Sequence, residues 1–130
     1  MFSGIVEAAE PILSATPSEG LVRIDVRKPA DFNDLKIGDS IATNGVCLTV
    51  EAFDDAKIRF ALAAETLKVL KWPEAGQLVG RRVNLERSLR YGDRIHGHLV
   101  SGHVEGIGTV VQREMFGESL FLTIEIPASV

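Results

Sequence analysis

The stretch Ser40-Ile41-Ala42-Thr43-Asn44-Gly45-Val46-Cys47-Leu48-Thr49-Val50 decides the fold class of this chain. Two strand-like segments flank Asn44-Gly45, a dipeptide that favours the positive φ angles of a two-residue hairpin turn. The stretch therefore predicts two antiparallel strands joined by a tight turn.

The strand pattern continues on both sides of this hairpin. Apolar and polar residues alternate over residues 21–27 and again over residues 57–62, as half-buried strands require. Residues 82–86 are interpreted as the closing strand. Six short strands with turn residues between them predict an all-β fold, a closed six-stranded antiparallel barrel.

Helices are expected to be few and short. Residues 64–70 contain helix-forming residues and stop before Trp72-Pro73, so they predict one helix. Residues 31–35 predict a single helical turn that Gly38 ends.

Composition and charge exclude several classes of function. The 130 residues are 45% hydrophobic and 25% charged, which is ordinary globular usage. A net charge of −4 and an aromatic content of 6% argue against nucleic-acid binding, which needs a basic face and stacking aromatics. No apolar stretch approaches the ~20 residues that span a bilayer, so no membrane partner is expected.

The single cysteine, Cys47, excludes an internal disulfide. No basic region followed by an apolar run marks a signal peptide at the N-terminus. A reducing, cytoplasmic location is the simplest expectation.

The chain contains an internal repeat. Gly4-Ile5-Val6-Glu7 reappears as Gly102-His103-Val104-Glu105, 98 positions later. Further echoes pair Ile24-Asp25-Val26 with Ile124-Glu125-Ile126, and Pro29-Ala30 with Pro127-Ala128. We expect a first barrel over residues 1–89, a linker over 90–96, and the start of an incomplete second barrel over 97–130. The second copy holds material for about two strands, at 109–111 and 120–126, so a fragment of a longer protein is expected.

All three histidines, His96, His98 and His103, fall within eight residues rich in glycine. Histidine titrates near neutral pH, so His98 and His103 are candidates for acid–base work. On a strand, residues five apart face opposite sides, so the two need not act on the same atom. Their spacing matches no common zinc site, and no metal is expected.

Five short motifs, in this order and at this spacing, resemble the riboflavin synthase family over essentially the whole chain. They are Met1-Phe2-Ser3-Gly4-Ile5-Val6-Glu7, Asn44-Gly45-Val46-Cys47-Leu48-Thr49-Val50, Glu65-Thr66-Leu67, Val83-Asn84-Leu85-Glu86-Arg87 and Gly97-His98-Leu99-Val100-Ser101-Gly102-His103. The resemblance implies two homologous six-stranded Greek-key barrels and a homotrimer held by a C-terminal helix that this sequence lacks.

The resemblance also implies a reaction. Two molecules of 6,7-dimethyl-8-ribityllumazine react, and one donates a four-carbon unit to the other. The products are riboflavin and 5-amino-6-ribitylaminouracil, and no cofactor is used. Each barrel is expected to hold one substrate in a pocket, and the working site lies between the first barrel of one subunit and the second barrel of a neighbour.

Candidate site residues follow from the same resemblance. The catalytic candidates are His98, His103, Cys47 and Ser40. The substrate-binding candidates are Gly4, Ile5, Val6, Cys47, Leu48, Thr49, Ala61, Leu62, Ala63, Ala64, Glu65, Thr66, Gly102, His103 and Val104. Ala63-Ala64 depart from the longer or polar residues of many relatives, which leaves backbone contacts there.

Structural alternatives stand beside these assignments. Ile5, Val6 and Leu48 can be plain core residues, Cys47 a small buried hydrophobe, and Thr66 a residue of the helix N-terminus. The alternative function is binding of a lumazine or flavin without conversion, by a binding protein or by a binding-only fragment that can dimerise.

Overall fold

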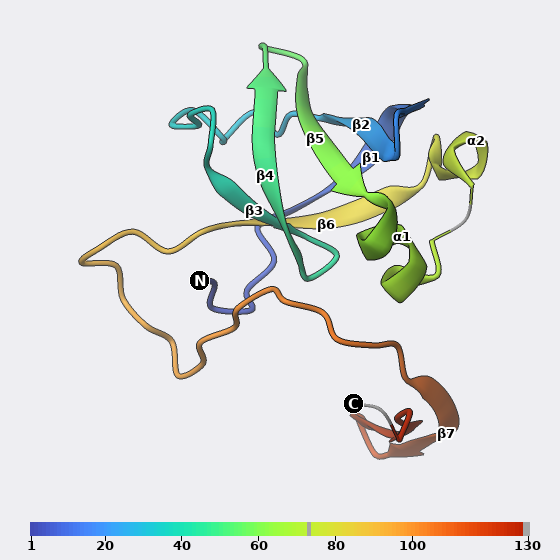
Figure 1. The fold of residues 1–130 in the computed structure, drawn as a ribbon. Helices are drawn as coiled ribbons and strands as arrows, with labels where there is room; N and C mark the ends of the chain where they lie inside the picture. Colours follow the sequence, from blue (N-terminus) through green and yellow to red (C-terminus); the bar gives the residue numbers. More distant parts are fainter. Residues whose placement is uncertain (73, 129–130) are drawn as a thin grey trace.

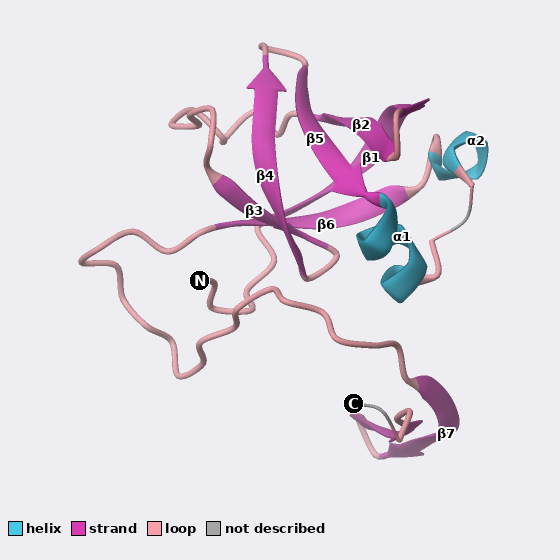
Figure 2. Ribbon diagram, in the orientation of Figure 1, coloured by secondary structure: helices cyan, strands magenta, loops and turns pink. Residues whose placement is uncertain are grey.

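The structure, a computed structural model, describes residues 1–72 and 74–128. Within them, six strands close an antiparallel barrel and two more form a separate hairpin (Figures 1 and 2). The barrel strands are β1 (Ala8–Ser18), β2 (Leu21–Arg27), β3 (Ser40–Thr43), β4 (Val46–Phe53), β5 (Lys57–Ala63) and β6 (Arg82–Arg87). Their order is β1-β2-β5-β4-β3-β6, and β6 closes the barrel by pairing with both β1 and β3. The predicted all-β Greek-key barrel is confirmed.

The predicted hairpin is the β3–β4 pair. Asn44 and Gly45 have φ angles of 49° and 82°, which is the conformation that a two-residue turn requires. Thr43 pairs with Val46, and the ladder continues to Ser40 and Thr49. The turn chemistry therefore sets the register of these two strands.

Three elements differ from the sequence-based expectation. The long strand β1 contains Pro11 and Pro17 and shows no clear alternation, yet β2 and β6 both pair with it. Helix α1 (Ala64–Leu70), in contrast to these three, lies where it is predicted. The short helix α2 (Ala75–Leu78) is not predicted, and residues 31–35 form turns rather than a helical turn.

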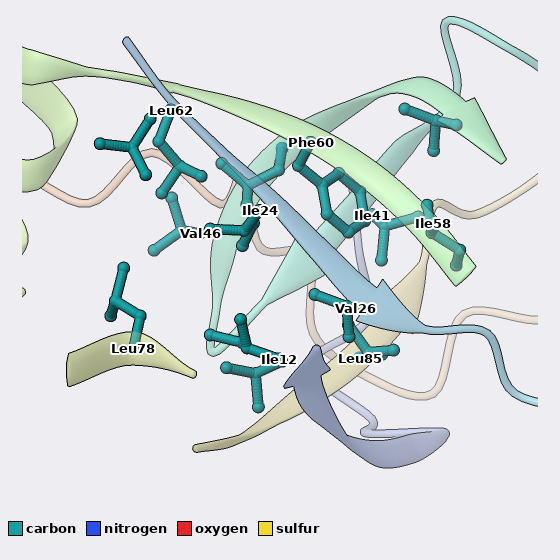
Figure 3. Close-up of a cluster of buried hydrophobic side chains, with 14 of the residues drawn as sticks. Ile12, Ile24, Val26, Ile41, Val46, Ile58, Phe60, Leu62, Leu78 and Leu85 are labelled. Atoms are coloured by element: carbon teal, nitrogen blue, oxygen red, sulfur yellow. The ribbon is translucent and has the colours of Figure 1, made fainter. Parts of the chain in front are cut away.

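Apolar side chains fill the interior of the barrel. Figure 3 shows Ile24, Phe60 and Ile41 converging between the strands, and each is fully buried. A small barrel has room inside only for its own side chains. The interior is therefore filled by the chain's own side chains, and a substrate pocket has to lie at the mouth or on the outer face of the barrel.

The second hairpin, β7 (Thr109–Phe116) with β8 (Ser119–Glu125), repeats the β1–β2 hairpin residue for residue. Ile12 pairs with Val26, and Val110 with Ile124, each 98 positions later. Both ladders shift register at the next residue, Leu13 in one and Val111 in the other. The repeat is thus a repeat of structure. The expected match of Ile24-Asp25-Val26 to Ile124-Glu125-Ile126 is wrong by two residues, because the register aligns Val26 with Ile124.

Every residue of β7 and β8 is exposed. Figure 1 shows the hairpin at the far end of a long loop from the barrel. No helix in the described part of the chain is both long enough and apolar enough to cross a bilayer.

Candidate functional site

The outer face of the β3–β4 hairpin carries the polar candidates. Alternation points Val46, Leu48 and Val50 inward, and all three are buried. Cys47, half-buried, and Thr49, exposed, point outward from the same strand. Ser40 pairs with Thr49 across the ladder, so Ser40, Thr49 and Cys47 share one outer face.

Strands β4 and β5 separate beside this face. Their ladder runs from Phe53 and Ile58 to Val50 and Phe60. Strand β5 continues to Ala63 while paired with β2 on its other side. The edges at residues 47–49 and 61–63 are therefore left outside the β4–β5 ladder. Backbone groups alternate in direction along a strand, so those of Cys47 and Thr49 and of Ala61 and Ala63 face this gap and require other partners.

One of these backbone groups already has a partner from far along the chain. The Cys47 N–H donates to the Gly102 carbonyl at 2.8 Å. Gly102 is buried with φ +78°, and a Cβ there would lie 2.8 Å from the Cys47 Cβ and 2.9 Å from the Phe2 ring. Only glycine fits this approach. The contact brings His103, the next residue, to the edge of β4, and Val104 packs against the core.

Helix α1 borders the same region. It starts directly after β5, and the Ala64 N–H donates to the Gly20 carbonyl at 3.1 Å. Glu65 is exposed and Thr66 is half-buried. The N-cap residue is Ala63, and no side chain caps the helix. Thr66 lies in the first turn of α1, as its structural alternative expects, but its hydroxyl does not cap the helix.

Two of the substrate-binding candidates point into the core. Leu48 is 5% exposed and Leu62 is 1% exposed, and both belong to the apolar cluster inside the barrel. Their backbone groups lie in the ladders with Ile41 and Val22, so neither residue presents a polar group to the open edge. Ala61 and Ala63 alternate with Leu62 and face outward.

The N-terminal candidates lie elsewhere. Gly4, Ile5 and Val6 are exposed, and Ile5 lines an open basin of about 880 Å³ together with Ser40. Arg87 is central to this basin: it pairs with Glu7 and Asp34, and its guanidinium lies 4.5 Å from the centre of the Phe32 ring. Burial raises the pKa of Glu7, but hydrogen bonds from Arg87 outweigh it, so the pKa is lowered overall.

The histidines do not lie on a strand. His98 and His103 are both exposed in loop segments, so the expectation of opposite strand faces does not apply. The His103 N–H donates to the Ser101 hydroxyl at 3.1 Å. His96 lines the basin near Arg94. No cluster of three metal-ligating side chains occurs in residues 1–72 and 74–128.

Sequence reasoning missed two residues that organise the region. Phe2 is fully buried, and Glu86 of β6 is 7% exposed although alternation points it outward. Glu86 Oε1 accepts hydrogen bonds from the Ser3 N–H at 2.7 Å, the Ser3 hydroxyl at 3.0 Å and the Gly4 N–H at 3.0 Å. Both residues belong to motifs that carry the family resemblance. Glu86 is nevertheless buried at an outward-facing position by a cover of distant residues, which no local sequence pattern encodes.

Comparison with known proteins relates the chain to lumazine-binding proteins and riboflavin synthases. Residues 3–88 match the family model described as the lumazine binding domain. A riboflavin synthase of Mycobacterium bovis is 40% identical over 131 residues, covering 100% of this chain and 64% of the relative. The structure of LumP complexed with 6,7-dimethyl-8-(1'-D-ribityl) lumazine matches with a TM-score of 0.79 and 25% identity, over 98% of this chain and 70% of LumP. The complex of LumP with riboflavin matches with a TM-score of 0.76 and 25% identity, over 98% and 68% of the two chains. The chain thus spans less than two thirds of the curated relative that it matches.

Proposed function

The chain belongs to the lumazine-binding domain family, and from this premise we propose that its barrel binds 6,7-dimethyl-8-ribityllumazine and riboflavin on its outer face. The observation that carries the proposal is the pair of strand edges outside the β4–β5 ladder, at residues 47–49 and 61–63, beside Gly102 and His103. A flat ring with carbonyl and imino edges can pair with such backbone groups as a further strand would.

The residues around these edges have separable roles in this proposal. The ring is oriented by the outward-facing backbone groups of these edges, those of Thr49, Ala61 and Ala63 and the Cys47 carbonyl, since the Cys47 N–H is taken by Gly102. The outward methyl groups of Ala61 and Ala63 leave room for its face. Glu65 and Thr66 of α1 offer hydrogen bonds to the polyhydroxyl tail. His103 and Val104 close the edge opposite α1.

We propose further that the longer protein of which such a barrel is part performs the riboflavin synthase reaction. One bound lumazine donates its four-carbon unit to a second, giving riboflavin and 5-amino-6-ribitylaminouracil without a cofactor. Holding two large rings together supplies effective molarity. Proton transfer by a positioned side chain supplies about 10²–10⁴-fold.

His103 is the first candidate for the proton transfer, because it lies beside Cys47 at the edge of the proposed site. His98 is the second. Cys47 and Ser40 are candidates for delivering a nucleophile or positioning water. The second ring comes from the second barrel of a neighbouring subunit, so full activity requires an oligomer, a trimer in the full-length family. Its proposed location is the reducing cytoplasm.

Binding without conversion is the second candidate function. The observation behind it is the similarity to LumP, whose solved structures hold 6,7-dimethyl-8-(1'-D-ribityl) lumazine or riboflavin.

A titration separates the two functions. Ligand fluorescence is followed as the protein is added to 6,7-dimethyl-8-ribityllumazine, and riboflavin formation is assayed in parallel. Saturable binding with riboflavin formation supports the enzyme, and binding alone supports the second candidate. Absence of binding contradicts both. In a protein that turns over, His103→Ala lowers kcat more than ligand affinity, and an equal loss of both contradicts the acid–base role.

A further inference from the structure

Glu86 is a buried carboxylate that the proposed chemistry does not use. It is 7% exposed and forms no ion pair with any described residue. Its Oε1 atom instead accepts three hydrogen bonds, two from backbone N–H groups and one from the Ser3 hydroxyl. A carboxylate removed from water is costly unless it is well hydrogen-bonded. Three hydrogen bonds to one oxygen atom therefore offset the cost of burying the Glu86 carboxylate.

Glu86 lies in one row with the proposed binding site. Ala42 pairs with Glu86 of β6 on one side and with Cys47 of β4 on the other. The three residues are neighbours on the outer face of the sheet. Ala42 is only 5% exposed, so this face is covered.

Two chain segments form the cover, and we call them together the strap: residues 2–4 and residues 100–102. Phe2 and Val100 exchange backbone hydrogen bonds, each 2.8 Å long. The strap is fixed to Glu86 through Ser3 and Gly4, and to Cys47 through the Gly102 carbonyl. The fully buried Phe2 ring lies between these ends, within contact of the Gly102 position.

We propose that Glu86 is a positioning residue that holds the strap against β3 and β4 and thereby places Gly102 and His103 beside Cys47. The inference deepens the proposed function, since His103 borders the proposed ligand site. It also explains why a charged residue is used. Hydrogen bonds to a carboxylate are stronger than those to a neutral amide, and His103 itself has only one backbone hydrogen bond, to the Ser101 hydroxyl, among the contacts described.

Cys47 is a built-in reporter of the strap. It is the chain's only cysteine, and Gly102 covers it closely. Its reaction with a thiol reagent such as 5,5'-dithiobis(2-nitrobenzoate) is therefore a rate measurement at a single site. We compare wild type, Glu86→Gln, which keeps an acceptor oxygen but loses the charge, and Glu86→Ala, which loses both.

The expected order of thiol reaction rates is wild type, then Glu86→Gln, then Glu86→Ala. The loss of hydrogen bonds to a charged group predicts roughly a tenfold or larger increase for Glu86→Ala. Gly102→Ala is the positive control, because its Cβ would collide with the Cys47 Cβ. Glu7→Gln is the matched negative control, because Glu7 lines the same basin but pairs with Arg87 rather than with the strap.

Urea unfolding of each variant separates local opening from global unfolding. The proposal is supported if Cys47 reacts faster in Glu86→Gln or in Glu86→Ala while the urea unfolding curve of that variant is unchanged. An unchanged rate in both variants, while Gly102→Ala reacts faster, overturns it. A rate that rises only in proportion to global unfolding also overturns it, because Glu86 would then be a general stability residue.

Lumazine titration supplies the second arm. Glu86→Ala is expected to weaken affinity roughly tenfold, whereas Glu7→Gln leaves it unchanged. Wild type that binds no lumazine contradicts the proposed function, while the thiol rates still decide the role of Glu86. Wild type that binds, with affinity unchanged in Glu86→Ala despite faster thiol reaction, overturns the link between the strap and the ligand site.

Discussion

Phe2 and Val100 occupy the same position in the two repeats, and they pair with each other. Each donates its backbone N–H to the other's carbonyl at 2.8 Å. Their separation of 98 residues is the offset that relates the β1–β2 hairpin to the β7–β8 hairpin. Gly4 and Gly102, two residues further along each repeat, have φ angles of +81° and +78°. A local two-fold relationship therefore joins the openings of the two repeats.

This relationship explains the different positions of the two equivalent segments. Residues 102–104 lie against β4 of the first barrel, where the Gly102 carbonyl accepts the Cys47 N–H. Residues 4–6 correspond to them, yet they lie along β6 and the basin rather than beside Cys47. The opening of the second repeat therefore packs on β4 of the first barrel, whereas the opening of the first repeat packs on β6 of its own barrel.

The first prediction concerns the close approach at Gly102. Gly102→Ala places a Cβ 2.8 Å from the Cys47 Cβ and 3.0 Å from the Cys47 backbone nitrogen, so residues 100–104 must shift. We expect faster amide hydrogen exchange at Val100 and Cys47 and roughly tenfold weaker lumazine binding. Exchange measured by NMR, with the fluorescence titration, tests both effects.

Gly97→Ala is the matched control for this prediction. Gly97 also has a positive φ, +104°, but nothing lies within 4 Å of its Cβ position. Backbone strain from a positive φ is therefore present in both variants, and only Gly102→Ala adds the collision. Equal effects of the two substitutions would show that strain, rather than the contact with Cys47, determines the result.

The second prediction concerns Asp25 on β2. Hydrogen bonds from Arg59, together with one from Lys57, hold the pKa of its carboxyl far below the usual range, although burial acts to raise it. A carboxyl whose pKa is lower in the folded than in the unfolded state stabilises the fold at pH values above its unfolded-state pKa of about 3.9. This stabilisation is lost as the pH falls from there toward the folded-state pKa. Urea unfolding should therefore show stability falling between about pH 5 and pH 2.

Asp25→Asn should cost about 1–3 kcal/mol of unfolding free energy at pH 7, because Arg59 and Lys57 lose their charged partner. The difference from wild type should shrink toward pH 3. Glu51→Gln is the control: Glu51 pairs with Arg23 at the surface, and no measurable change is expected. A difference for Asp25→Asn that is constant with pH would exclude titration of Asp25 as its cause.

Local pattern predicted the parts of the fold that local physics determines. Asn44-Gly45 fixes the β3–β4 register, and alternation identifies β2 and β5, because each pattern acts through neighbouring residues. Strand β1 has prolines at positions 11 and 17 and forms because β2 and β6 supply partners on both sides. Such a strand depends on tertiary pairing that its own sequence does not encode.

The candidate site also contains residues that the sequence could identify and residues that it could not. The resemblance identified the residues on β4, on β5 and at 102–104 that the structure brings to one outer face. It did not separate Leu48 and Leu62, whose side chains face the core, from their outward neighbours. Glu86 was missed because its importance lies in donors more than 80 positions away.

The third prediction concerns Thr43 of β3. Its side chain is fully buried, and Oγ1 has no hydrogen-bond partner among the described residues. Thr43→Val keeps the shape and removes an unsatisfied hydroxyl, so it should raise the unfolding free energy by about 1 kcal/mol. Thr16→Val, at an exposed position of β1, is the control and should stay within about 0.5 kcal/mol of wild type. A destabilised Thr43→Val would reveal a partner for the hydroxyl, such as a buried water.

The fourth prediction compares the two equivalent hairpins. β1–β2 and β7–β8 share one register and one bulge position, but only the first has partner strands on both sides. Phe121, Leu122 and Ile124 of β8 are all about half exposed, whereas Ile24 and Val26 of β2 are fully buried. An isolated two-stranded hairpin is at best marginally stable in water.

Amide hydrogen exchange should therefore reach the global unfolding limit in β2 and remain fast in β8. The measurement is made at several protein concentrations, because a second copy that covered the hairpin would slow exchange as the concentration rises. Fast exchange in β8 at all concentrations is expected from the described contacts. If β8 were protected as strongly as β2 even in dilute protein, the β7–β8 hairpin would be stable without partner strands, and the prediction would be wrong.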